Sequence, residues 1–252
     1  MSNPILVTGA SGVVGGAIVR TLVEAGISVR QAVRNPQKAQ PGIESVALDY
    51  TQPATFQPAL AGAAGLVLIV PSIDPVASAQ LPTFVASAKA AGVGHTVFIS
   101  AFGTNYDEAS PLRIIEHAVI GSGIPYTILR PNFFMENFST GFLSGSIRAQ
   151  NGFFLAAGDS KTSFISTRDI AAVTLAAFQK PLAGAELDLT GPESLDHFQA
   201  AALIAEAAGR PITYHPLTEE QMIAGGIAAG LPEYAAQYLA MLYGIVRAGQ
   251  LA

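Results

Sequence analysis

Short, uninterrupted apolar runs alternate with helical patterns along the first half of this chain. The runs lie at residues 5–7, 66–70, 95–100 and 126–129. Strands that are apolar without alternation are buried on both faces, as in parallel sheets covered by helices. Strands separated by helices of about 10–15 residues form right-handed βαβ units. The pattern therefore predicts an α/β fold with a doubly wound parallel sheet.

The composition argues against several other classes. Half of the 252 residues are apolar and 12% are charged, unlike a disordered chain. The longest apolar stretch, residues 59–71, is too short for a membrane helix of roughly 20 residues, and no leader pattern opens the chain. The absence of cysteine and of paired histidine spacing predicts no metal site. With a net charge of −5 and no basic stripe, we expect a cytoplasmic protein without nucleic-acid or membrane partners.

A glycine pattern, GxxGxxG, lies between the first strand and the first helix. Its residues are Thr8, Gly9, Ala10, Ser11, Gly12, Val13, Val14 and Gly15. We expect Gly9 to allow a tight turn, Gly12 to let a pyrophosphate approach the backbone, and Gly15 to let the helix pack close to the sheet. The helix N-terminus offers N–H groups and a positive dipole end to phosphates. In this context the pattern predicts a dinucleotide-binding loop.

The residues after the second strand favour NADP, with NAD as the alternative. A NAD site has an acidic residue about 20 residues past the glycines, and none lies between residues 24 and 44. Arg34 falls there instead, and its guanidinium suits a 2′-phosphate. The alternative is that Arg34 and Lys38 are ordinary solvated charges of a loop. Asp49 either faces the adenine or caps a turn. Further cofactor contacts are expected where two later strands end, at Val70, Pro71, Ser72, Ser100, Ala101 and Phe102.

The second half of the chain has a different pattern. Residues 131–164 are rich in Phe, Gly, Ser and Asn and have no long periodic run. Thr167 and Asp169 are expected to cap a helix. Helices are predicted at 170–178, 194–208, 218–229 and 232–248, and short strands at 185–189 and 212–214. We expect one NAD(P)-binding domain over 1–252, with a small C-terminal α/β lobe and substrate-covering parts at about 131–184 and 192–252.

Six of the 13 phenylalanines lie between residues 133 and 154, just after the strand that ends at Pro131. The crevice of a doubly wound sheet opens at such strand ends. These rings therefore form either a slot for a flat aromatic substrate or the plain core of the lobe. The residues expected to bind substrate are Phe102, Tyr106, Asn132, Phe133, Phe134 and Phe138. Ser100 and Tyr106 are the candidate catalytic residues, and Arg130 is expected to pair with an acid of the lobe.

Four segments together resemble the NmrA-like group of atypical short-chain dehydrogenases: TGASGVVG, VRQAVRNPQKA, IPYTILRPNFFMEN and STRDIAAV. The later LTGPESLDHFQAAALIAEAAGRPITY is similar to that group too. The resemblance implies a Rossmann-type domain with a small C-terminal lobe, a bound NAD(P)H, and reduction of quinones, triphenylmethane dyes or azo dyes. It also implies a second kind of member, a regulator that binds the dinucleotide without turning it over.

The chain departs from typical short-chain dehydrogenases, in which the lysine of a Tyr-x-x-x-Lys pair lowers the pKa of the tyrosine. None of its four lysines follows a tyrosine by four residues; those positions hold Arg34, Val85, Ala157 and Ala176. Counted back from the strand at 126–129, the tyrosine position falls on Glu108 and the lysine position on Leu112. A site without a strong acid favours acceptors that delocalise the added charge.

We therefore expect an NAD(P)H-dependent reductase that transfers hydride to a quinone or another conjugated aromatic acceptor, whose product is then primed for reaction with oxygen. The alternative is a non-catalytic NADP-binding redox sensor that acts through a protein partner. A sugar-nucleotide epimerase is disfavoured because the Tyr-x-x-x-Lys pair is absent. The apolar helix at 232–248 is either lobe core or a homodimer face.

Overall fold

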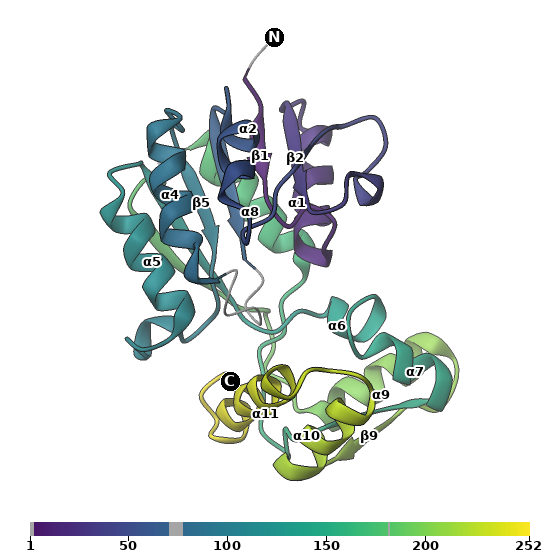
Figure 1. Ribbon diagram of the computed structural model, residues 1–252. Helices are drawn as coiled ribbons and strands as arrows, with labels where there is room; N and C mark the ends of the chain where they lie inside the picture. The colour runs from purple at the N-terminus through teal and green to yellow at the C-terminus, as the bar shows by residue number, and fades with distance from the viewer. Residues whose placement is uncertain (1–2, 71–77, 181) are drawn as a thin grey trace. The chain divides into compact units, whose positions relative to one another are not determined.

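The computed structural model describes residues 3–70, 78–180 and 182–252 (Figure 1). The chain divides into two compact units. The first consists of Met1–Pro131 and Ser166–Leu189, and the second of Asn132–Ile165 and Thr190–Ala252. Each unit therefore takes its residues from two separate stretches of the sequence.

The first unit contains a seven-stranded parallel sheet with the strand order β3-β2-β1-β4-β5-β6-β8. In chain order the strands are β1 (Ile5–Val7), β2 (Val29–Val33), β3 (Glu44–Ala47), β4 (Gly65–Ile69), β5 (Thr96–Ile99), β6 (Tyr126–Pro131) and β8 (Ala185–Leu189). The strand order reverses between β1 and β4, as in dinucleotide-binding sheets. The predicted doubly wound α/β fold is confirmed, and its central strands are the apolar runs of the sequence.

Helices cover both faces of this sheet (Figure 1). On one face α1 packs against α8, and on the other α4 packs against both α2 and α5. The helices are α1 (Val13–Glu24), α2 (Phe56–Leu60), α4 (Leu81–Ala90), α5 (Pro111–Gly121) and α8 (Thr167–Gln179), with single turns at Pro36–Lys38, Pro53–Thr55 and Thr104–Tyr106. The side chain of Ser166, not Thr167 or Asp169, caps α8 by accepting from the Arg168 N–H.

A buried carboxylate joins several elements of the first unit. Glu116 on α5 is completely buried and accepts two hydrogen bonds from Arg130, both at 2.8 Å. It also accepts from Ser100 at 2.6 Å and from Arg113 at 2.8 Å. Burial raises the pKa of Glu116, but the bonds from Arg130, Ser100 and Arg113 outweigh this effect, so the pKa lies below its usual value.

The partner predicted for Arg130 was wrong in its location. Among the described residues, none of the acidic side chains that contact Arg130 belongs to the lobe. Besides Glu116 of α5, Arg130 contacts Glu186 and lies 3.9 Å from Asp188, and both of these acids are on β8. Because β8 pairs directly with β6, its alternate residues bring carboxylates to the strand that carries Arg130.

The second unit contains two short parallel strands and five helices among its described residues. They are α6 (Glu136–Ser139), α7 (Ser144–Gln150), β7 (Gly152–Leu155), α9 (His197–Ala208), β9 (Thr213–Pro216), α10 (Glu219–Ala228) and α11 (Glu233–Arg247), and β7 pairs with β9. The sequence pattern missed α6, α7 and β7, since each is too short to show periodicity. The helix expected from residue 194 begins at His197, because Asp196 caps it in a capping box with Gln199.

Aromatic side chains form the core of the second unit around a buried histidine. The ring of His197, which is 1% exposed, lies 5.4–6.4 Å from the rings of five neighbours: Phe138, Phe153, Phe164, Tyr214 and Tyr243. Within the described part of the chain, neither ring nitrogen has a hydrogen-bond partner. Burial lowers the pKa of His197 to about 4, although the Asp196 carboxylate acts in the opposite direction.

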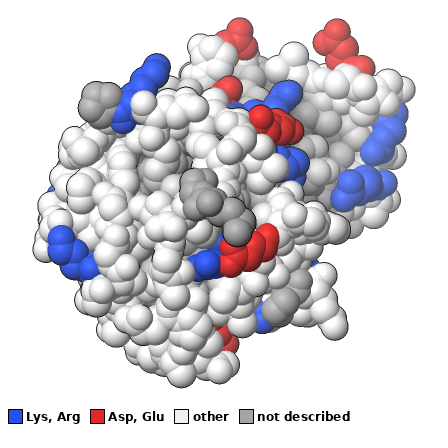
Figure 2. Space-filling view, turned by 90° about the horizontal axis from the view of Figure 1, so that it is seen from above, with Lys and Arg blue, Asp and Glu red and all other residues white. Residues whose placement is uncertain are grey.

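The surface carries few charges. On the face drawn in Figure 2, the blue and red side chains are scattered among many white ones. None of the helices in the described ranges is long and apolar enough to span a bilayer. The scattered charges match a chain in which only 12% of the residues are charged.

The buried histidine predicts a pH-dependent stability. Its pKa is about 4 in the folded protein and near 6.5 in an unfolded chain. The unfolded state therefore binds more protons between these values, and the free energy of unfolding should fall by about 3 kcal/mol as the pH drops from about 6.5 to 4. Urea unfolding of His197→Leu should show less of this loss. The same change at exposed His215 should keep the wild-type dependence, and a wild-type slope in His197→Leu would contradict the assignment.

The buried carboxylate predicts a large stability difference between two glutamates that both bind Arg113. Glu116→Gln removes the charge that faces Arg130 in the interior, so it should lower the free energy of unfolding by about 3 kcal/mol. Glu108 is 68% exposed, and Glu108→Gln should have a much smaller effect. Urea titrations of the two variants compare them directly. Equal losses would show that burial does not govern this network.

Candidate functional site

The glycine loop connects β1 to α1, and two of its glycines are structurally required. Gly9 has a φ of +60°, which favours glycine. A Cβ on Gly15 would lie 2.2 Å from the carbonyl oxygen of Gly9. The nearest neighbour that Gly15 approaches is therefore the loop backbone at Gly9 and Ala10, and not the sheet that the sequence suggested. A Cβ on Gly12 would lie 3.2 Å from the same oxygen.

The loop presents backbone donors at the start of α1. Ser11, Gly12 and Val13 are exposed. The Gly12 N–H donates to Gly9 O at 2.9 Å, but in the part of the chain that the structure describes the N–H groups of Ser11, Val13 and Val14 have no partner. The first N–H groups of a helix lack intrahelical acceptors and suit an anion. The open cradle at Gly12 and these donors fit the pyrophosphate of a dinucleotide.

Thr8 holds the base of the loop. Its buried hydroxyl donates to Ile69 O at 2.9 Å and accepts from Ile69 N–H at 2.7 Å. These bonds tie the end of β1 to the end of β4, at the point where the strand order reverses. Among the other predicted residues, Ala10 is buried, Val70 is half-buried at the end of β4, and Pro71 and Ser72 lie outside the described residues.

The basic residues predicted to select NADP are exposed after β2. Arg34 and Lys38 form no ion pair among the described residues. Bonds from Thr51 and Gln52 lower the pKa of Asp49, and the Arg34 charge adds to this effect. Asp49 therefore lies within electrostatic range of Arg34. Its carboxylate caps the turn through the Thr51 N–H at 2.9 Å, which is one of the two roles that the sequence left open.

Two glutamines position the loop after β2, and the sequence interpretation missed them. The buried Gln31 side chain donates to Gln40 O and accepts from Gln40 N–H, each at 2.9 Å. The Gln40 side chain donates to Gly16 O at 3.3 Å. These bonds attach the segment that carries Arg34 and Lys38 to α1. The only signal for this role in the sequence was a glutamine in the middle of the strand Val-Arg-Gln-Ala-Val.

The first residue after β5 is Ser100, whose hydroxyl proton is already used in a hydrogen bond. Ser100 is 7% exposed and donates its one proton to Glu116, so only its lone pairs are left for a ligand. Ala101 and Phe102 are half-buried, and the Phe102 N–H donates to Pro131 O at 2.9 Å. Tyr106 is 79% exposed in the turn that follows. Its catalytic role stays a prediction.

The remaining substrate candidates belong to the second unit. The buried Asn132 side chain donates to Leu251 O at 2.9 Å and accepts from the Phe133 N–H at 2.7 Å. The Phe133 ring lies 5.3 Å from that of Tyr243, and Phe134 forms a β-bridge with Ile165. Both phenylalanines are half-buried. Of the phenylalanines between residues 133 and 154, only Phe138 lines the pocket described next.

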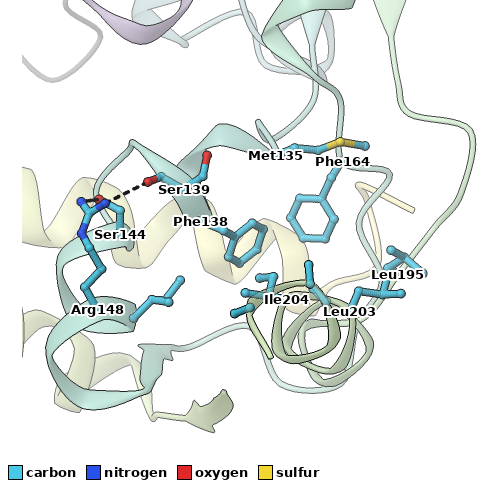
Figure 3. Close-up of a pocket in the computed structure, with 13 residues that line it drawn as sticks. Met135, Phe138, Ser139, Ser144, Arg148, Phe164, Leu195, Leu203 and Ile204 are labelled. Carbon is cyan, nitrogen blue, oxygen red and sulfur yellow. Dashed lines mark hydrogen bonds between the residues drawn. The ribbon is translucent and has the colours of Figure 1, made fainter. Parts of the chain in front are cut away.

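An apolar pocket of about 570 Å³ lies within the second unit (Figure 3). Phe138 of α6 and Phe164 point into it, and Leu203 and Ile204 of α9 line the opposite side. Arg148 of α7 lines it as well. The volume falls within the range of about 300–1,000 Å³ that is usual for small-molecule sites. The sequence missed the contribution of α9, because an apolar helix face reads equally well as core.

The described residues show no group of three or more acidic or histidine side chains that could hold a metal ion. The donors at the glycine loop suit phosphate groups instead.

Comparisons with known proteins agree with this geometry. An NAD(P)H azoreductase of Xenophilus azovorans is 34% identical over 98% of this chain and 89% of its own. The structure of an NADPH-dependent quinone oxidoreductase of Escherichia coli, in complex with NADPH, has a TM-score of 0.82 and 29% identity, with coverage of 98% and 90%. The structure of a Citrobacter triphenylmethane reductase with NADP(H) has a TM-score of 0.81 and 25% identity, with coverage of 99% and 91%.

The match to a family extends over almost the whole chain and includes both units. The segments that resemble the family in the sequence run from the glycine loop to β9. Residues 1–248 match the sequence model of the NmrA-like family, and the chain belongs to that family.

Proposed function

We propose that this protein is an NAD(P)H-dependent reductase that transfers hydride to a quinone or another conjugated aromatic acceptor. The observation that carries the proposal is the loop from Gly9 to Gly15, whose N–H groups at the start of α1 have no partner among the described residues. Further support comes from relatives that are named as reductases of azo compounds, quinones and triphenylmethane dyes.

NADPH is the proposed cofactor, with NADH as the weaker alternative. The N–H groups of the loop would hold the pyrophosphate, and Gly12 would let it approach the backbone without a Cβ in the way. Arg34 would bind the 2′-phosphate through paired hydrogen bonds, with Lys38 beside it. Asp49, Val70, Pro71, Ser72, Ser100, Ala101 and Phe102 complete the proposed cofactor contacts.

The chain's own residues favour an acceptor that needs no strong acid. When bound, the reduced nicotinamide supplies hydride. Ser100 accepts hydrogen bonds and cannot donate one while its proton points to Glu116. No lysine stands four residues after a tyrosine, so the usual proton donor of short-chain dehydrogenases is absent. A quinone that receives hydride becomes a stabilised anion and takes its proton from water or from exposed Tyr106.

The proposed substrate contacts are Phe102, Tyr106, Asn132, Phe133, Phe134 and Phe138. Segments at about 131–184 and 192–252 are proposed to cover the substrate. Aromatic side chains bind flat rings by stacking and apolar burial, so positioning supplies much of the rate. The hydroquinone product can react with oxygen, and in this way the reaction would prime an aromatic substrate for hydroxylation.

Two observations support a second function. The only proton of Ser100 is held by a buried carboxylate, and the chain has no Tyr-x-x-x-Lys pair. Both features suit a protein that binds NADP without turning it over and acts through a protein partner. Such a sensor would bind NADPH tightly and reduce no acceptor.

An anaerobic assay of NADPH oxidation separates these functions. We expect loss of the reduced-nicotinamide absorbance with quinones and azo dyes, at about one turnover per second or faster, and none with simple ketones. Gly15→Ala is the control, because its Cβ would meet Gly9 O at 2.2 Å and should prevent NADPH binding. Tight NADPH binding without oxidation by any acceptor would favour the sensor.

The cofactor preference is predicted to depend on Arg34. Arg34→Ala removes the guanidinium proposed for the 2′-phosphate, so the Kd for NADPH should rise about tenfold while that for NADH stays unchanged. Fluorescence titration with both dinucleotides measures the two constants. Arg168, an exposed arginine of α8, supplies the matched control Arg168→Ala. An equal effect on NADPH and NADH would contradict the role of Arg34.

A further inference from the structure

The pocket of the second unit has a single charged side chain in an apolar lining. Among its 13 lining residues, all within the described part of the chain, Arg148 is the only one with a formal charge and none is acidic. Phe138, Phe164, Leu203 and Ile204 supply ring and branched surface. Water in contact with such a surface is released when an apolar ligand enters, so the pocket favours an apolar occupant.

The guanidinium of Arg148 is held in place without being neutralised. It donates to Ser144 Oγ at 2.8 Å and to Ser139 O at 3.4 Å (Figure 3). These bonds use two of its five donors. No carboxylate of the described residues lies within 4.0 Å of it. The guanidinium is therefore oriented by neutral groups, and its charge and remaining donors are available to an anionic ligand.

The position of Arg148 supports a role in the pocket. Arg148 lies in the last turn of α7, where a cation generally complements the helix dipole. Its side chain does not contact the last carbonyl groups of α7, however. It runs back to Ser144, in the first turn of the helix, and to Ser139 in α6. Ser139 and Ser144 also line the pocket, so the guanidinium of the exposed Arg148 lies beside two other lining residues, at the edge of the pocket.

We propose that this pocket binds a small amphipathic anion. The apolar or aromatic body of the ligand lies between Phe138, Phe164 and α9, and its carboxylate, sulfonate or phosphate group binds Arg148. The site is made from residues of the second unit alone, so it requires no bound dinucleotide. The proposal therefore goes beyond the reductase function and does not depend on it, although the pocket shares Phe138 with the proposed substrate contacts.

Two fluorescent probes of the same shape test the proposal. The first, 8-anilinonaphthalene-1-sulfonate, carries an anionic group, and the second, N-phenyl-1-naphthylamine, has the same rings without it. Both are titrated into the full-length protein without NADPH. We expect each probe to bind one site per chain. Arg148→Ala should weaken the sulfonate about tenfold and leave the neutral probe unchanged, while Lys161→Ala, which removes an exposed charge outside the lining, should change neither.

A second pair of variants tests the location. Ala207 lines the pocket, whereas the exposed Ala149 on α7 does not. Ala207→Trp should fill the pocket and abolish binding of both probes, and Ala149→Trp should leave binding intact. Absence of probe binding, equal effects of Arg148→Ala and Lys161→Ala, or equal effects of the two tryptophan variants would each overturn the proposal. A parallel NADPH titration reports on the reductase proposal separately, since failure there would leave the probe results intact.

Discussion

The buried carboxylate of Glu116 organises the second half of the sheet. It accepts hydrogen bonds from Ser100 after β5, from Arg113 on its own helix and from Arg130 on β6. Arg130 in turn reaches Glu186 on β8. A completely buried charge is tolerated only when it is paired and hydrogen-bonded. The network therefore fixes how α5, β5, β6 and β8 meet, at the end of the sheet where a cofactor is expected.

The same network determines what Ser100 can do. A serine hydroxyl after a central strand looks like a candidate proton donor from the sequence. Because its proton is directed to Glu116, it presents acceptor lone pairs to any ligand. The first unit thus combines a well-formed anion cradle with weak acid chemistry. That combination suits acceptors that receive hydride readily and hold the charge in a conjugated ring.

The two units differ in the kind of surface that they offer to a ligand. The first presents backbone N–H groups that have no partner among the described residues, and its loop has glycine where a Cβ would meet the loop backbone. The second buries aromatic rings around His197, a histidine kept neutral by burial, and leaves an apolar pocket with one free cation among its lining residues. The proposed dinucleotide contacts and the lining of the apolar pocket therefore belong to separate sets of residues.

The sequence by itself determined the sheet, the glycine loop and the basic residues after β2. Continuous apolar runs that alternate with helical patterns are typical of strands buried on both faces of a parallel sheet, and Gly9, Gly12 and Gly15 have a spacing that a strand-loop-helix turn requires. Only the tertiary structure decided the partners of Arg130, the direction of the Ser100 proton, and which of the phenylalanines between residues 133 and 154 lines a pocket. These depend on contacts between residues far apart in the chain, such as Ser100 with Glu116 and Phe138 with His197, and no local periodicity records them.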